Sequence, residues 1–126
     1  MTDSKLLDSS VWLAYFYAEN NEIKSIVESN IILLTSSISL FEVKNKLIKD
    51  KTDSIKIQNS VDFIKQRSLI IDVGAEIAEE AVEIAKKNKL PIIESLIYAS
   101  SLKNNSELIT LDNEFRDLDN VKILKN

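Results

Sequence analysis

Short apolar runs alternate with amphipathic stretches along the whole chain. The runs with the length of buried strands are 6–7, 31–34, 69–73, 107–111 and the shorter 121–124. Between them, apolar residues recur at helical spacing in the stretches 11–17, 23–27, 37–49, 55–64, 75–87 and 92–102. Strands separated by helices predict an α/β fold with a mostly parallel central sheet flanked by helices. The last strand is expected at a sheet edge.

Acidic residues stand where two of these strands end. Asp8 directly follows the first run, and Asp112 directly follows the run 107–111. Glu42 and Glu94 lie within about two turns of predicted helix starts. In a parallel sheet, strand ends and the starts of the following helices share one edge, and ligands bind in the crevice beyond it. The four carboxylates could therefore converge on one site.

Each acid also has a purely structural explanation. Asp8 could merely help to cap the helix that follows it. Glu42 precedes Lys46 by four residues, which would give an ordinary surface ion pair, and Glu94 would favour a helix dipole. Asp112 suits a turn. The position of any one acid therefore does not identify a site.

The composition excludes several kinds of chemistry. The chain contains no cysteine and no histidine, which excludes thiol nucleophiles, zinc sites built on these residues and an imidazole general base. The single glycine, Gly74, and the single proline, Pro91, exclude a glycine-rich phosphate loop and a dinucleotide-binding fingerprint. Any reaction must therefore use carboxylates, hydroxyls, amines or a bound ion.

Length and apolar content bound the organisation of the chain. With 44% apolar residues, 126 residues suffice for a single domain, 1–126, with one core. Residues 1–5 lack the features of a signal peptide, and no apolar run approaches the roughly 18 residues of a membrane span. We therefore expect a cytoplasmic protein without membrane contact. Its net charge of −4 argues mildly against a general nucleic-acid coat protein.

Four converging carboxylates would repel one another unless a cation lay among them. Oxygen ligands without nitrogen or sulfur select Mg²⁺ or Mn²⁺, and carboxylates can hold one or two such ions. These ions promote phosphodiester cleavage, because they lower the pKa of a bound water and stabilise charge on the phosphate and the leaving oxygen. The acids therefore indicate metal-dependent hydrolysis, a reaction that needs no histidine.

Four segments resemble motifs of the PIN-domain ribonucleases, and specifically of the VapC toxins of VapBC toxin-antitoxin systems. The first is the strand that ends in Asp8, with Ser10 two residues later. The second is 36–43, in which Glu42 follows a serine by six residues. The others are 90–99, of the form Leu-x-x-x-(acid)-x-Leu-Ile-x-Ala, and 110–115, of the form Thr-x-Asp-x-(acid)-Phe. The resemblance covers nearly the whole chain in order and spacing.

The resemblance implies a PIN-like fold and a role for each acid. The residues that would be catalytic and hold the metal are Asp8, Glu42, Glu94 and Asp112, with Glu114 as an auxiliary acid. Ser10 and Thr110 would orient Asp8 and the metal-bound waters. The family usually has Asp at the third position, so Glu94 is a departure. Its longer side chain could shift the metal or weaken activity.

The resemblance also implies an endoribonuclease toxin that is silenced by an antitoxin protein and forms a homodimer, with Mg²⁺ or Mn²⁺ as cofactor. The lysines that could border the crevice and bind RNA phosphates are Lys44, Lys46, Lys49, Lys51, Lys86, Lys87 and Lys89. These lysines could equally be solvated helix faces. The sequence does not reveal which RNA would be bound.

Other functions remain open. A PIN nuclease of RNA maturation would act without an antitoxin, and a catalytically weak PIN domain would serve as a binding module. A receiver-type signalling domain also binds Mg²⁺ at strand ends. It would require two adjacent acids after its first strand and a lysine after its fifth, where this chain has Asp8 alone and Asp112.

Overall fold

The computed structural model describes residues 3–125, and five strands alternate with six α-helices and one 3-10 helix in that range. The strands are β1 (Lys5–Leu7), β2 (Leu33–Ser36), β3 (Leu69–Ile71), β4 (Glu107–Thr110) and β5 (Val121–Ile123). The helices are α1 (Ser9–Phe16), α2 (Asn21–Val27), α3 (Ser37–Lys49), α4 (Ser54–Arg67), α5 (Ala75–Asn88), α6 (Ile92–Lys103) and the 3-10 helix η1 (Asn113–Phe115).

The strands form one parallel sheet in the order β3-β2-β1-β4-β5. In the central strand, Leu6 lies opposite Leu34 on one side and opposite Leu108 on the other. Because all pairings are parallel, the carboxyl ends of the strands lie along one edge. This confirms the predicted α/β fold with its parallel sheet.

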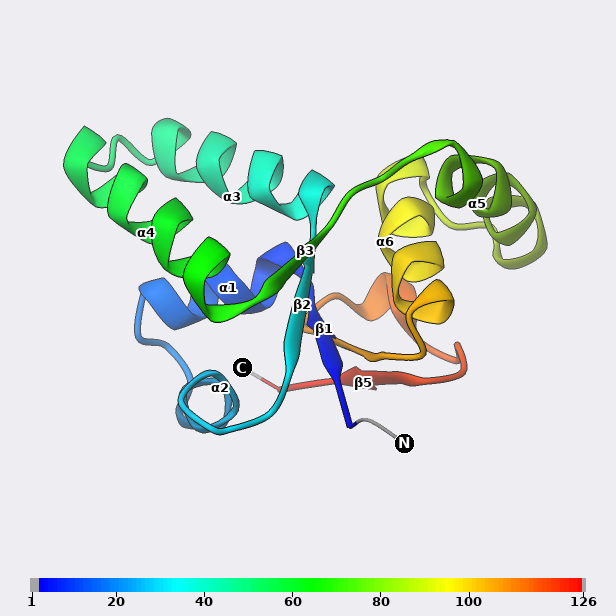
Figure 1. Cartoon of the computed structure of the whole chain (residues 1–126), viewed down its shortest axis with the longest axis horizontal. Helices are drawn as coiled ribbons and strands as arrows, with labels where there is room; N and C mark the ends of the chain where they lie inside the picture. Colours follow the sequence, from blue (N-terminus) through cyan, green and yellow to red (C-terminus); the bar gives the residue numbers. More distant parts are fainter. Residues whose placement is uncertain (1–2, 126) are drawn as a thin grey trace.

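Helices cover both faces of the sheet. Helices α1 to α4 lie on one side of the strands, and α5 and α6 lie on the other (Figure 1). Successive side chains of β1 point to opposite faces of the sheet and so pack against both helix layers. Leu7 belongs to the core cluster that includes Trp12, whereas Leu6 belongs to the cluster that includes Tyr98. Both leucines are fully buried, as predicted for a central parallel strand.

Several element boundaries differ from the sequence prediction. The strand predicted at 31–34 begins at Leu33 and continues through Ser36, whose hydroxyl caps α3 by accepting a hydrogen bond from the N–H of Ile38. Helix α1 begins at Ser9, two residues earlier than expected. The tail strand lies at a sheet edge, as predicted.

The prediction that 69–73 is a buried strand is wrong. Strand β3 ends at Ile71 and forms the edge of the sheet, where Leu69 is 62% exposed. Apolar residues cluster here in sequence, but an edge strand has only one neighbour to cover it. Asp72, expected inside the strand, is exposed beyond its end.

No helix in the described part of the chain is long and apolar enough to cross a membrane.

Candidate active site

The candidate site lies where the strand order of the sheet reverses. The chain passes from β1 outward to β2 and β3, and then returns to the other side of β1 to form β4. Asp8 directly follows β1, and Asp112 follows β4 after one intervening residue. Reversals of this kind leave a crevice at the carboxyl ends of the strands, which is the usual ligand site of open α/β sheets.

Two hydroxyl groups hold Asp8 in place. Asp8 is only 5% exposed, and its Oδ2 atom accepts hydrogen bonds of 2.8 Å from Ser10 Oγ and from Thr110 Oγ1. The Ser10 hydroxyl accepts a bond of 3.1 Å from the N–H of Leu111, and the Thr110 hydroxyl accepts one of 2.9 Å from the N–H of Asp112. Asp8 occupies the N-cap position of α1, but its side chain makes no capping hydrogen bond. These contacts instead fix Asp8 relative to Asp112.

A cluster of three carboxylates is formed by Glu94, Asp112 and Glu114. One oxygen from each lies within 4.8 Å of the others. Glu94 projects from the first turn of α6, and Glu114 belongs to η1, where its N–H donates a 2.9 Å hydrogen bond to Asp112 Oδ1. Glu94 and Asp112 are separated by the rest of helix α6 and strand β4, and the return of the chain from α6 into β4 brings their carboxylates together.

Glu42 reaches the site from α3. It is half-buried, and its Oε1 atom accepts a hydrogen bond of 3.0 Å from Ser9 Oγ. Ser9 directly follows Asp8, so the start of α1 connects the two acids. Glu42 is not a member of the three-carboxylate cluster. Burial raises the pKa of its carboxyl most, and the charges of Asp8, Glu94 and Asp112 raise this pKa further.

The same repulsion acts on the other acids. Burial raises the pKa of Asp8; the hydroxyls of Thr110 and Ser10 oppose this shift, and the charge of Asp112 adds to it. Burial also raises the pKa of Glu94, and the charges of neighbouring carboxylates raise it further. A cation would relieve these repulsions, because it stabilises the charged form of every acid around it.

The side chains of the site fit a hard divalent cation. All of its candidate ligand atoms are carboxylate oxygens, which Mg²⁺ and Mn²⁺ prefer, and the chain contains no histidine or cysteine to serve as a nitrogen or sulfur ligand. Glu94, Asp112 and Glu114 could bind such an ion directly, with Asp8 and Glu42 beside them. Serine and threonine hydroxyls that orient Asp8 are the kind of support that metal ligands commonly have.

Sequence reasoning missed the role of Ser9. The resemblance implied a contact of Ser10 with Asp8 but gave Ser9 no role at the site, whereas the Ser9 hydroxyl donates a hydrogen bond to Glu42 and the Ser10 hydroxyl donates one to Asp8. Ser9 and Ser10 form a doublet directly after a strand-ending acid, which is the only sequence signal of this arrangement. Which acid each would contact depends on where α3 lies relative to α1.

The lysines divide according to their positions along the helices. Lys49 is the last residue of α3 and follows Glu42 by seven residues, which corresponds to about 10 Å along a helix, and Lys51 lies beyond the end of that helix, so both lie away from the crevice. Lys46 pairs with Asp50 at 3.2 Å. Lys89 lies in the turn between α5 and α6, close in sequence to Glu94, and is exposed.

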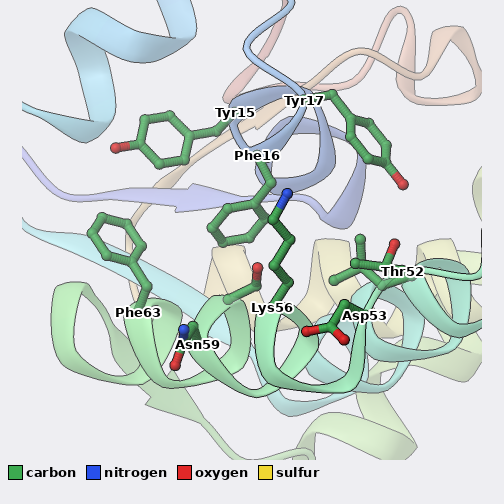
Figure 2. A pocket seen from close by; sticks show the side chains of 10 residues that line it. Tyr15, Phe16, Tyr17, Thr52, Asp53, Lys56, Asn59 and Phe63 are labelled. Atoms are coloured by element: carbon green, nitrogen blue, oxygen red, sulfur yellow. The ribbon is translucent and has the colours of Figure 1, made fainter.

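An apolar hollow of about 780 Å³ lies between α1 and α4, away from the acids. Figure 2 shows Tyr15, Phe16 and Tyr17 on one side of it and Phe63 on the other. None of the predicted site acids lines this hollow. Among the aromatic residues of the stretch 11–17, Trp12 is fully buried whereas Tyr17 is 42% exposed. Trp12 is consequently not available for contacts between subunits.

Comparison with known structures shows proteins of the same fold. A toxin-antitoxin complex from Klebsiella pneumoniae aligns with a TM-score of 0.79 and 21% identity, covering 97% of this chain and 99% of that chain. VapBC2 from Rickettsia felis, bound to a DNA fragment from its promoter, aligns with a TM-score of 0.79 and 20% identity, covering 98% of each chain. The Mycobacterium tuberculosis toxin VapC20, described as cleaving the sarcin-ricin loop, aligns with a TM-score of 0.74 and 16% identity, covering 94% of this chain and 97% of that chain.

Comparison with curated proteins gives no match. The family model of the PIN domain matches residues 5–121, a range that contains every acid of the candidate site. The resemblance inferred from the sequence motifs is thereby confirmed. The chain belongs to the PIN domain family.

Proposed function

We propose that this protein is a metal-dependent endoribonuclease, with Asp8, Glu42, Glu94 and Asp112 as its catalytic acids. The observation that carries the proposal is the cluster of Glu94, Asp112 and Glu114, whose oxygens lie within 4.8 Å of one another beside the buried Asp8. Membership of the PIN family supports it, and it argues against the receiver-type alternative. RNA as substrate is supported by the likeness to VapC20, described as a toxin that cleaves the sarcin-ricin loop.

Mg²⁺ or Mn²⁺, when bound, would polarise the scissile phosphate and lower the pKa of a water molecule. The residues of the chain would supply position and charge. Glu94, Asp112 and Glu114 would bind the ion, while Ser10 and Thr110 would keep the Asp8 carboxylate turned toward it. Ser9 would orient Glu42 in the same way.

We further propose that the enzyme acts as the toxin of a toxin-antitoxin pair in the cytoplasm and that it is a homodimer. The support for an antitoxin partner is that several proteins of the same fold are toxin-antitoxin complexes. An antitoxin would silence the enzyme by covering the crevice. Growth arrest on expression of the chain alone, relieved by Asp8→Asn, would support the toxin; healthy growth with an active enzyme would favour a role in RNA maturation. A monomeric mass by light scattering would contradict the dimer.

The direct test is cleavage of a mixed-sequence single-stranded RNA by the purified protein with Mn²⁺, with Mg²⁺ and with a chelator. Asp8→Asn provides the inactive variant. Asp72→Asn is a matched control, because Asp72 follows β3 at the same edge of the sheet but is exposed and outside the cluster. We expect cleavage that requires metal, is lost in Asp8→Asn and persists in Asp72→Asn.

Two results would contradict the proposed nuclease activity. If Asp8→Asn cleaved at the wild-type rate, the catalytic role of this site would be wrong. If the wild type neither cleaved RNA nor bound Mn²⁺ in a calorimetric titration, the carboxylates would not form a metal site. Loss of cleavage with Mn²⁺ binding intact would favour the alternative of a PIN binding module.

A further inference from the structure

A polar cleft of about 490 Å³ adjoins the carboxylate cluster. Its walls are the turn between α5 and α6, with Lys89 and Pro91, and the segment after η1, with Arg116. Glu114 lines the cleft and also belongs to the three-carboxylate cluster, and Pro91 is the N-cap of the helix that carries Glu94. The cleft and the candidate metal site therefore share a wall.

Two cations face this cleft from opposite walls. Lys89 and Arg116 are both exposed, and none of the ion pairs in the described part of the chain involves either of them. The Arg116 guanidinium makes only a long hydrogen bond of 3.4 Å to the carbonyl of Asn113. Two acids, Glu114 and Asp117, also line the cleft. A metal ion bound at the carboxylate cluster would offset the negative charge of Glu114, which leaves Asp117 as the acid that opposes the two cations. Unpaired cations beside a metal site can bind a phosphate group.

The two walls are held by one part of the core. Leu90 follows Lys89 and is 8% exposed, while Phe115 precedes Arg116 and is 1% exposed. Leu90 and Phe115 belong to the same cluster of buried side chains. Lys89 has a left-handed backbone conformation (φ 55°), and the N–H of Leu90 bonds the carbonyl of Ala85, so the turn itself is defined. Both cations therefore project from fixed backbone, which lowers the entropic cost of binding.

We propose that this cleft binds the nucleotide next to the scissile bond, with Lys89 and Arg116 contacting its phosphate. The inference rests on the proposed function, because it assumes that RNA is cleaved at the carboxylate cluster. A volume of about 490 Å³ lies within the range of about 300–1,000 Å³ that ligand pockets occupy. A phosphate held there would align the strand across Glu114 and Asp112. Lys89 and Arg116 are positioning residues and take no part in bond breaking.

The test compares Lys89→Gln, Arg116→Gln and the double variant with Lys24→Gln. Lys24 is exposed on α2, which leads into the amino end of β2, so this control removes the same charge far from the site (Figure 1). Steady-state cleavage of a single-stranded RNA with Mn²⁺ is measured over a series of salt concentrations. Mn²⁺ affinity and melting temperature are measured for each variant.

We expect KM to rise about three- to tenfold in each single variant, while kcat changes less than about twofold, because the cations bind the backbone equally in ground and transition state. The dependence of log(1/KM) on log salt should become shallower by about 0.7 for each phosphate contact removed. Arg116→Lys should retain most of the wild-type KM. Mn²⁺ affinity and melting temperature should stay unchanged.

The outcomes separate the subsite from the nuclease. If the wild type cleaves RNA and the cleft variants match Lys24→Gln in KM and salt dependence, the proposal that the cleft binds a phosphate is wrong, while the proposed nuclease activity is still supported. A loss confined to kcat, or a weakened Mn²⁺ affinity, would also contradict a positioning role. If the wild type cleaves no RNA, the proposed function fails and the subsite fails with it.

Discussion

Thr110 donates a hydrogen bond of 2.8 Å to the carboxylate of Asp8, although the two residues are 102 positions apart in the chain. The bond joins the ends of β1 and β4, the two strands between which the sheet order reverses. The same hydroxyl accepts a bond from the N–H of Asp112. One buried threonine thus connects two of the acids on which the proposed chemistry depends.

Replacing this threonine tests the connection. Thr110→Val keeps the shape of the side chain but removes the hydroxyl, so Asp8 loses a donor and the Asp112 N–H loses its acceptor. We expect Mn²⁺ affinity or cleavage rate to fall about 10- to 100-fold, as is typical when a group that orients a metal ligand is lost. Calorimetric titration and cleavage assays measure the two effects. Thr110→Ser retains the hydroxyl and should stay within a few-fold of wild type; equal losses in both variants would indicate a packing effect.

The metal-free protein should become more stable on mild acidification. Burial, followed by repulsion from neighbouring carboxylates, raises the pKa of Asp8 above 3.8 and the pKa values of Glu42 and Glu94 above 4.5 in the folded state. Between these ordinary values and the raised ones, the folded protein binds more protons than the unfolded chain, so the free energy of unfolding falls as pH rises. Asp50 has a lowered pKa, so its contribution falls below 3.8, outside this window.

Thermal unfolding in a chelator checks this expectation. The melting temperature of the wild type should be higher near pH 5 than near pH 7, and the difference should shrink in Asp8→Asn because the buried charge is gone. At neutral pH, Asp8→Asn should be as stable as the metal-free wild type or more so. Saturating Mn²⁺ should raise the melting temperature of the wild type, since a ligand at about 100 times its Kd adds about 2.7 kcal/mol. A wild type whose stability rises steadily from pH 5 to 7 would contradict the electrostatic account.

Glu94 can be compared directly with the acid that the PIN family usually has at this position. Its oxygen already lies within 4.8 Å of the carboxylates of Asp112 and Glu114. Glu94→Asp should preserve or raise metal-dependent cleavage, whereas Glu94→Gln removes a ligand charge and should reduce it by at least about tenfold. Initial cleavage rates over a range of Mn²⁺ concentrations distinguish these variants. Complete loss of activity in Glu94→Asp would mean that the site has adapted to the longer side chain.

Arg67 should stabilise the fold without affecting the site. Its guanidinium donates hydrogen bonds of 2.6, 3.0 and 3.0 Å to the carbonyls of Val27, Ser29 and Ile31, and so ties the end of α4 to the loop before β2. We expect Arg67→Ala to lower the free energy of unfolding by about 2 kcal/mol, because three backbone acceptors lose a charged donor. Denaturant unfolding measures the loss. Mn²⁺ affinity at a temperature where the variant is folded should match wild type; a strong loss would contradict this separation.

Local patterns were sufficient where the physical cause is local. The period of apolar residues identified every strand and most of the helix length, and Asp8 and Asp112 stand after strands in sequence as they do in the sheet. The error at β3 has a physical reason. An apolar run indicates that a strand is at least partly buried, but it does not indicate how many strands lie beside it. Leu69 is apolar and yet 62% exposed, because β3 is the edge strand.

The sequence by itself therefore determined the order and kind of the elements, the absence of thiol and imidazole chemistry, and the set of acids. Only the tertiary structure decided the strand order and the contacts that follow from it. The bond between Ser9 and Glu42, the grouping of Glu94 with Glu114, and the cleft shared by Lys89 and Arg116 all join segments that are distant along the chain. Such contacts depend on which strands pair and which helix faces are buried, and these choices are made by the whole core rather than by any local stretch of sequence.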